Sequence, residues 1–208
     1  MENQDFFGSG SIPKIMAKIA PPVMLAQLIQ ALYNIVDSFF VGRYSADALT
    51  AVTVIYPLQL IIIALAVGTG VGVNTYMARK YAQEQPDVAQ AAAGTGFLLA
   101  LISWALFALV SNLIMVPYVR TSATEPQAIA QATAYGRIVC TGAPGTFLEG
   151  NWSKVHQSRG NMRLPMIAQI AGALLNVVLD PVLIFGFGAI PSLGVAGAAY
   201  ATVAGQIL

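Results

Sequence analysis

The chain of 208 residues has few charged side chains, and this scarcity limits the class of protein it can be. Asp, Glu, Lys and Arg together make up 9% of the residues, whereas they make up about a quarter of an average soluble domain. Hydrophobic residues make up 57%, and the mean hydropathy is +0.69. Such a chain cannot cover itself with a hydrated surface, so the composition indicates an integral membrane protein.

Cysteine and histidine are nearly absent, with one residue of each, Cys140 and His156. A single cysteine cannot form an internal disulfide. One histidine with one distant cysteine gives neither a zinc site nor a nucleophile and its base, so we expect no enzyme, no cofactor and no metal beyond Na⁺. The net charge is +1, whereas nucleic-acid-binding proteins carry a clear excess of basic residues. The chain is therefore not expected to bind nucleic acid.

Apolar segments of membrane-spanning length alternate with short polar connections, a pattern typical of a polytopic helical bundle. We expect an all-α fold in which a cytoplasmic segment, residues 1–11, precedes a six-helix transmembrane lobe, residues 12–208. The predicted helices cover residues 12–41, 49–77, 88–116, 127–149, 164–187 and 195–208. The last has about fourteen residues, too few at about 1.5 Å each to cross a hydrocarbon core of roughly 30 Å, so we expect a truncated sixth helix.

The distribution of basic residues predicts the orientation in the membrane. If the N-terminus is cytoplasmic, the outer connections hold only Arg43 and Arg120, and most basic residues fall on the inner side. Those inner residues are Lys14, Lys18, Arg79, Lys80, Lys154, Arg159 and Arg163. The positive-inside rule therefore favours a multi-pass protein with a cytoplasmic N-terminus.

A polar motif lies inside the apolar run of residues 164–187. Asn176 and Asp180 are four residues apart, which places their side chains on one helical face, one turn apart. Pro181 removes a backbone N–H and leaves the carbonyl of Val177 without its helical partner. A carboxylate at membrane depth is costly and usually functional, and this pocket of oxygens suits a proton or a small hard cation.

The first predicted helix carries a matching polar stripe. Its residues recur at spacings of three, four and three along one side of the helix: Gln27, Gln30, Asn34 and Asp37. For Gln27 and Gln30, lining a cavity and hydrogen bonding between helices are equally good interpretations. For the two aspartates we favour a function, because holding helices together needs no ionisable group. Asp37 lies five residues before Gly42 and Asp180 six before Gly186, so both acids are expected at similar height, facing one chamber.

Several of these stretches resemble the multidrug and toxic compound extrusion (MATE) transporters. They are QALYNIVDSFFVG at residues 30–42, NVVLDP at 176–181, GVAGAAYAT at 194–202, and the connection containing RGN at 159–161 and LPM at 164–166. Each alone is a weak signal, but together they are specific and extend over nearly the whole chain. The resemblance implies a secondary antiporter in the bacterial cytoplasmic (inner) membrane. It would export cationic or amphiphilic drugs in exchange for H⁺ or Na⁺.

The resemblance also implies roles for particular residues. Family members bind the coupling cation in the N-terminal lobe, through acids that match Asp37 and Asp180 with Asn176 beside them. A tyrosine of the fourth helix matches Tyr135 and a threonine of the sixth matches Thr202. An alternative for Tyr135 is an interfacial anchor.

Prolines in the two polar helices are candidate hinges. Burial and a second nearby carboxylate both oppose ionisation, so binding of H⁺ or Na⁺ would neutralise the pair and allow the first helix to bend. Pro21 and Pro22 near its inner end, and Pro181 beside Asp180, are the candidate bending points.

Glycines one helical turn apart favour close helix packing in a membrane. Gly68 and Gly72 have this spacing in the second predicted helix. Gly197 and Gly205, with Ala201 between them, repeat it in the sixth. We expect both sets to lie where two helices approach each other.

The chain matches only one lobe of such a transporter, and this leaves alternatives open. The expected partners are a cationic or amphiphilic small molecule, the lipid bilayer, and either a C-terminal lobe or a second copy of the chain. A flippase for lipids or lipid-linked glycans would have a similar topology but is expected to have a strongly basic chamber. A non-transporting truncated remnant would use its acids only to hold helices together.

Overall fold

The computed structural model describes residues 11–188 and 190–207, and its regular structure in these ranges is helical apart from one isolated bridge between Phe187 and Ile190. Most of the segment expected at residues 1–11, and Leu208, lie outside the described residues. The helices are α2 (Ile12–Tyr44), α3 (Ala46–Ala82), α4 (Pro86–Ser122), α5 (Pro126–Thr141), α6 (Pro144–Ser158), α7 (Arg163–Phe185) and α8 (Val195–Ile207). The described part of the chain is therefore the all-α bundle that the composition predicts.

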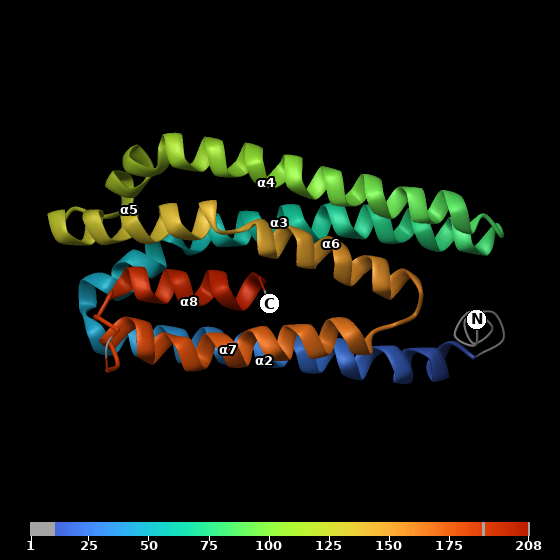
Figure 1. Cartoon of the computed structure of the whole chain (residues 1–208), viewed down its shortest axis with the longest axis horizontal. Helices are drawn as coiled ribbons and strands as arrows, with labels where there is room; N and C mark the ends of the chain where they lie inside the picture. The colour runs from blue at the N-terminus through green and yellow to red at the C-terminus, as the bar shows by residue number, and fades with distance from the viewer. Residues whose placement is uncertain (1–10, 189, 208) are drawn as a thin grey trace.

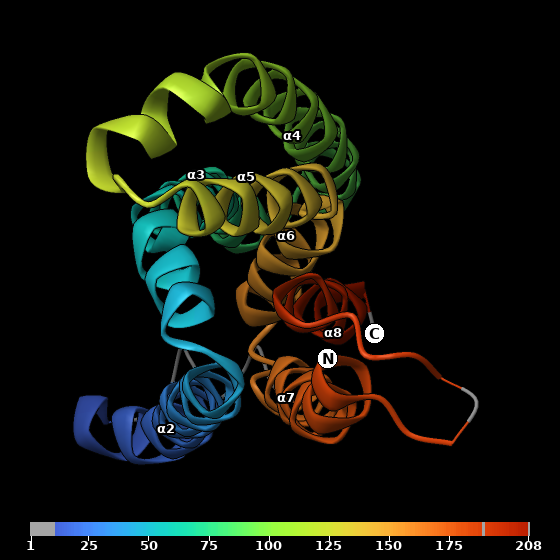
Figure 2. The same cartoon turned by 90° about the vertical axis from the view of Figure 1, so that its left-hand side faces the viewer.

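The helices lie roughly along one common axis, and short connections reverse the chain at its two ends (Figure 1). One end carries the α2–α3, α4–α5 and α7–α8 connections, and we call it the Ser45 end after the residue joining α2 to α3. The other carries the α3–α4 and α6–α7 connections, and we call it the Arg159 end. Viewed along the axis, α2, α7 and α8 form one side of the bundle and α3 and α4 the other, with α5 and α6 between them (Figure 2).

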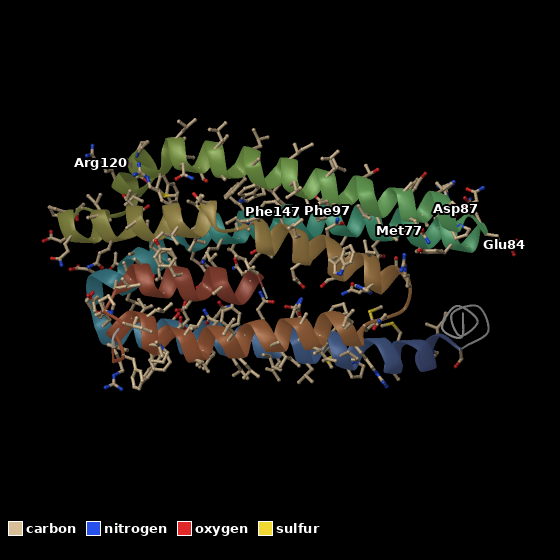
Figure 3. All side chains as sticks on the ribbon, in the orientation of Figure 1. Met77, Glu84, Asp87, Phe97, Arg120 and Phe147 are labelled. Atoms are coloured by element: carbon tan, nitrogen blue, oxygen red, sulfur yellow. The ribbon has the colours of Figure 1, made fainter. Side chains whose placement is uncertain are left out.

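The outer surface of the bundle is apolar. Among the residues that the structure describes, four helical segments are long and apolar enough to cross a membrane: Ala20–Tyr44, Ala46–Ala82, Pro86–Ser122 and Arg163–Phe185. Leu98, Leu106 and Leu113 of α4 are largely exposed, an arrangement that is unfavourable in water and suited to lipid. Three of the charged residues lie at the ends of the bundle, Arg120 at the Ser45 end and Glu84 and Asp87 at the other (Figure 3). The protein is therefore a multi-pass membrane protein.

Helix boundaries follow local sequence signals. Ser45 caps α3 by accepting a hydrogen bond from the backbone N–H of Ala48 at 3.0 Å. Pro86, Pro126 and Pro144 each occupy the first position of a helix, where no N–H is needed. Gly186 ends α7 with φ +83°, a conformation that side chains disfavour.

The fourth predicted helix differs from the structure. The sequence predicts one helix over residues 127–149, but α5 ends at Thr141 and α6 begins at Pro144. Pro144 disfavours a helical conformation at the preceding residue, and Gly142 has a low helix propensity. At the break, Trp104 of α4 donates a hydrogen bond to the carbonyl of Thr141 at 3.1 Å. The fourth crossing therefore consists of two short helices.

Glycines allow α8 to pack closely against its neighbours. A Cβ atom at Gly197 would collide with the backbone of Leu183 in α7, and one at Gly172 of α7 would collide with Gly205. The packing expected for Gly197 and Gly205 is therefore present. The expectation for Gly68 and Gly72 was wrong, since no atom lies within 4 Å of a Cβ built at either. Helical phase explains the difference, because Gly70 between them faces α6.

Candidate functional site

The two aspartates lie together in the interior of the bundle. Helices α2 and α7 pack against each other and run in the same direction (Figure 1). Asp37 of α2 is 6% exposed and Asp180 of α7 is 0% exposed. Their carboxyl groups are close enough for a protonated one to donate a hydrogen bond to the other. The structure thus brings together the two acids that the sequence places at similar height.

Asn176 links Asp180 to α8. Its amide nitrogen lies 3.4 Å from Oδ1 of Asp180. When the side-chain amide of Asn176 is flipped, both its nitrogen and its oxygen have hydrogen-bond partners. In this orientation the nitrogen donates to Oδ2 of Asp180 at 3.2 Å. The amide oxygen then accepts from the backbone N–H of Thr202 at 3.1 Å. The spacing of four residues therefore places Asn176 beside Asp180, as expected for one helical face.

A small cavity of about 50 Å³ adjoins Asp37. Its lining comes from three helices: Tyr33, Asn34, Asp37 and Ser38 of α2, Val52, Tyr56 and Gln59 of α3, and Thr202 of α8. Two oxygens in this region, Oδ1 of Asp37 and Oγ1 of Thr202, are buried without a hydrogen-bond partner among the described residues. Buried oxygens without partners are unusual, and a proton or a small cation is a ligand that they would accept.

Tyr135 of α5 is fully buried. Its hydroxyl accepts a hydrogen bond from the Gln59 side chain at 3.2 Å, and it lies near Thr202 and Asp37. A fully buried position does not fit the alternative of an interfacial anchor. All five residues predicted for the cation site are therefore gathered between α2, α5, α7 and α8.

A second, much larger cavity of about 530 Å³ lies beside the small one. Most of its lining comes from α6, α7 and α8, with Gln30 and Tyr33 of α2, Ile63 of α3 and Phe97 of α4. Asn176 and Thr202 also contribute. Phe97, labelled in Figure 3, lies near the middle of the bundle. The two cavities therefore share part of their walls.

The polar stripe of α2 is only partly directed at these cavities. Gln30 lines the large cavity and Asn34 the small one, as predicted. Gln27 lines neither, and its side chain is exposed. Met24 and Leu28 are exposed as well, whereas Ala26 is buried, so Gln27 lies on an outward face of α2.

Sequence reasoning missed Tyr33, Tyr56 and Gln59. Tyr33 lies three residues after Gln30 and four before Asp37, so the periodicity of the stripe includes it. Gln59 is an isolated amide within a long apolar segment, which in a membrane helix indicates a polar contact. Tyr56 has no comparable signal, because tyrosine is common in membrane helices.

The prolines proposed as hinges lie within continuous helices. Pro21 and Pro22 are inside α2, and Pro181 is inside α7, next to Asp180. Each removes one hydrogen bond from its helix. A role in bending stays a prediction.

Fold and site define the class of the protein: a polytopic helical membrane protein with a polar, acid-containing interior. The family model described as MatE matches residues 22–182. The chain is 27% identical to a probable multidrug resistance protein, YoeA, of Bacillus subtilis over 95% of its length and 43% of the relative's. It is also 27% identical to an FAD transporter of Shewanella oneidensis over 94% of its length and 43% of that protein's.

Among solved structures, the chain is similar to a multidrug resistance MATE family transporter in an outward-facing conformation. The TM-score is 0.86 at 29% sequence identity, with 93% of this chain and 42% of that chain covered. The chain belongs to the MatE family. It spans less than half the length of these relatives and corresponds to roughly their N-terminal half.

Proposed function

We propose that the chain is the N-terminal lobe of a secondary antiporter that exports cationic or amphiphilic drugs in exchange for H⁺ or Na⁺. One observation carries this proposal: Asp37 and Asp180 are buried side by side, and Oδ1 of Asp37 has no partner among the described residues. Two carboxylates in a desolvated site resist being charged together, so the pair favours uptake of a positive ion. A site used only to hold helices together would not need two acids.

The five predicted residues have distinct roles in this proposal. Asp37 and Asp180 bind the cation, as a shared proton or as Na⁺ coordinated by oxygens. Asn176 orients Asp180, and the hydroxyls of Tyr135 and Thr202 supply further oxygens for Na⁺. Hard cations such as Na⁺ prefer oxygen ligands of this kind, and the proposal includes no other metal.

The shared walls of the two cavities give a route for coupling. Asn176 bonds Asp180 and also lines the large cavity, which has a size typical of small-molecule sites. A change at the aspartates therefore alters the cavity in which a substrate would lie. Cation binding would neutralise the acids, and bending of α2 at Pro21 and Pro22 or of α7 at Pro181 would then change access.

The distribution of basic residues supports a cytoplasmic N-terminus in a bacterial inner membrane. Arg79 and Lys80 lie in the last turn of α3, at the Arg159 end, and Arg159 donates a hydrogen bond to the Tyr81 hydroxyl at 3.0 Å. Arg120 lies at the opposite end (Figure 3). In this orientation the aspartates lie in the outer half of the membrane.

Transport by this mechanism requires a second lobe. Relatives are more than twice as long as the chain, so half of the wall around a substrate would come from a C-terminal lobe or from a second copy. The efflux experiment below therefore uses the lobe together with its partner lobe, whereas ion and ligand binding are measured on the chain itself.

Three other functions are distinguished by the tests. A flippase would bind a lipid-linked anion and would not transport cationic drugs. The relative named as an FAD transporter makes a dinucleotide anion a second alternative substrate. A non-transporting remnant would show no response to H⁺ or Na⁺ in reconstituted membranes.

The test is drug efflux by the two-lobed transporter carrying Asp37→Asn or Asp180→Asn. We expect each variant to insert normally into the membrane and to lose efflux, because asparagine cannot exchange a proton and binds Na⁺ weakly. Full transport by either variant would overturn the proposal. Purified chain in lipid nanodiscs provides the control for folding through its thermal melting curve.

A further inference from the structure

The large cavity contains a carboxylate that the cation site does not use. Glu149 of α6 lines the cavity, whereas Asp37 and Asp180 do not. Within the described part of the chain it is the one carboxylate in this lining, and the one basic side chain is His156. A carboxylate on the wall of a cavity inside a membrane bundle is costly and usually functional, so its surroundings indicate its purpose.

Neutral donors hold Glu149 in place without neutralising it. Its Oε1 atom accepts hydrogen bonds from the hydroxyl of Ser153 at 2.6 Å and from the amide of Gln169 in α7 at 3.1 Å. The other oxygen, Oε2, has no partner among the described residues. Because both donors are uncharged, the negative charge remains available to a ligand in the cavity.

Other polar atoms that line the cavity can also accept hydrogen bonds, and the Thr146 hydroxyl can in addition donate one. Oγ1 of Thr146 and Oε1 of Gln206 are buried without a hydrogen-bond partner among the described residues, and both residues line the cavity. Buried acceptors without partners favour a ligand that donates hydrogen bonds or carries positive charge. An anion would meet the carboxylate of Glu149 and the unpaired amide oxygen of Gln206, neither of which can donate a hydrogen bond to it.

The remaining wall suits an apolar or aromatic body. Trp152 and Phe97 are about half exposed and line the cavity, and Trp152 contacts His156 edge to face at 5.7 Å. Trp152 lies one turn from Glu149 on α6, so a cation near the carboxylate is also close to an indole ring. Indole is the aromatic side chain that attracts cations most strongly. The cavity volume of about 530 Å³ admits a molecule of drug size.

We propose that Glu149 is the residue that selects the charge of the substrate, and that the cavity takes monovalent organic cations with an aromatic or aliphatic body. The cationic centre would lie at Oε2 of Glu149 and the apolar body against Trp152 and Phe97. This inference rests on the proposed function, because it assumes that the cavity holds the substrate. It adds a charge-selecting residue that is separate from the site of the coupling ion.

The test uses two probes of equal shape and opposite charge, tetraphenylphosphonium and tetraphenylborate. Binding of each to the purified chain in nanodiscs is measured by equilibrium dialysis, with empty nanodiscs subtracted. The wild-type chain is expected to bind the cation at least tenfold more tightly than the anion. Glu149→Gln keeps the oxygen that accepts from Ser153 and Gln169 but removes the charge. It is expected to weaken cation binding about tenfold and to leave anion binding no weaker.

Glu149→Asp is the matched control, because it keeps the charge and should retain most of the preference for the cation. Unchanged cation binding in Glu149→Gln, or tighter binding of the anion than of the cation by the wild type, would overturn the inference. Misfolding is recognised by loss of binding of both probes. In that case Ala168→Lys, which adds a positive charge to the wall of the same cavity, must weaken cation binding and leave anion binding no weaker, and failure to do so overturns the inference.

Failure of this inference is distinguishable from failure of the proposed function. The response of the chain to H⁺ and Na⁺ depends on Asp37 and Asp180, so Glu149→Gln is expected to retain it. If that response persists while Glu149→Gln binds the cation normally, charge selection by Glu149 is wrong and the antiport proposal is unaffected.

Discussion

Tyr33 of α2 and Thr202 of α8 line both the small cavity beside Asp37 and the large cavity that contains Glu149. Two residues therefore form the boundary between the proposed ion site and the proposed substrate site. An event on one side of this boundary changes the wall of the other. Coupling between ion and substrate then requires only a local rearrangement of α2 and α8.

Thr202→Val tests the role of this boundary, because it is expected to affect thermal stability and Na⁺ affinity in different ways. Oγ1 of Thr202 is buried without a partner among the described residues, and such a group costs about 1–3 kcal/mol. We expect the variant to melt at the same or a higher temperature than the wild type, because valine has a similar shape and no hydroxyl. We also expect its Na⁺ affinity to fall several-fold. Thermal melting and Na⁺ titration of the purified chain measure the two effects, and a less stable variant with normal Na⁺ affinity would contradict this role.

The hydrogen bond between Gln59 and Tyr135 is expected to stabilise the bundle. Tyr135 is fully buried, and Gln59 donates to its hydroxyl at 3.2 Å. Gln59→Leu leaves this hydroxyl without its donor, which we expect to cost about 1–3 kcal/mol. Tyr135→Phe added to Gln59→Leu should recover part of the loss, because the hydroxyl that lost its donor is then absent. A double-mutant cycle by thermal unfolding measures the interaction, and strictly additive losses would show that the bond contributes nothing.

Close packing between α7 and α8 predicts different effects of two glycine substitutions. A methyl group at Gly172 would collide with the backbone of Gly205, whereas Gly68 has no atom within 4 Å of its Cβ position. Gly172→Ala is therefore expected to lower the melting temperature by displacing α8. Gly68→Ala is the matched control and should be neutral or stabilising by up to about 1 kcal/mol through helix propensity. Equal effects of the two substitutions would contradict the observed packing.

Removing one acid of the pair should affect ion binding more than folding. Asp180 is 0% exposed and bonds Asn176, so Asp180→Asn keeps a polar partner for that amide. A buried charge is replaced by a neutral group of the same shape, and we expect unchanged or higher stability. Binding of Na⁺ should fall by more than tenfold, measured by isothermal titration. A variant that retains Na⁺ binding but loses stability would indicate a structural role for this acid.

The positions of the acidic residues in the site could be predicted from the sequence, because they depend on helical periodicity. Asn176 and Asp180 share a helical face because of their spacing, and Asp37 meets Asp180 because both lie at similar distances from the ends of helices that run in the same direction. These relationships need only helix geometry and a count of membrane crossings. The resemblance to the family added Tyr135 and Thr202, which lie on helices without a polar stripe.

Other features depend on tertiary packing and could not be read from spacing. Gln27 fits the polar stripe, but at that level the bundle covers Ala26 and leaves the Gln27 side chain exposed. The break between α5 and α6 has a signal in Gly142 and Pro144, yet the apolar run continues through it. The surroundings of Glu149 depend on Gln169, twenty residues away on the next helix.

The central claim is that Asp37 and Asp180 together bind the coupling ion. The most direct measurement is the charge displaced on a solid-supported membrane when the reconstituted protein receives a rapid jump in H⁺ or Na⁺ concentration. The account predicts a transient current for at least one of the two ions in the wild-type chain and no current in the variant carrying both Asp37→Asn and Asp180→Asn. A current of wild-type size in that double variant, or no current with either ion in the wild type, would contradict it.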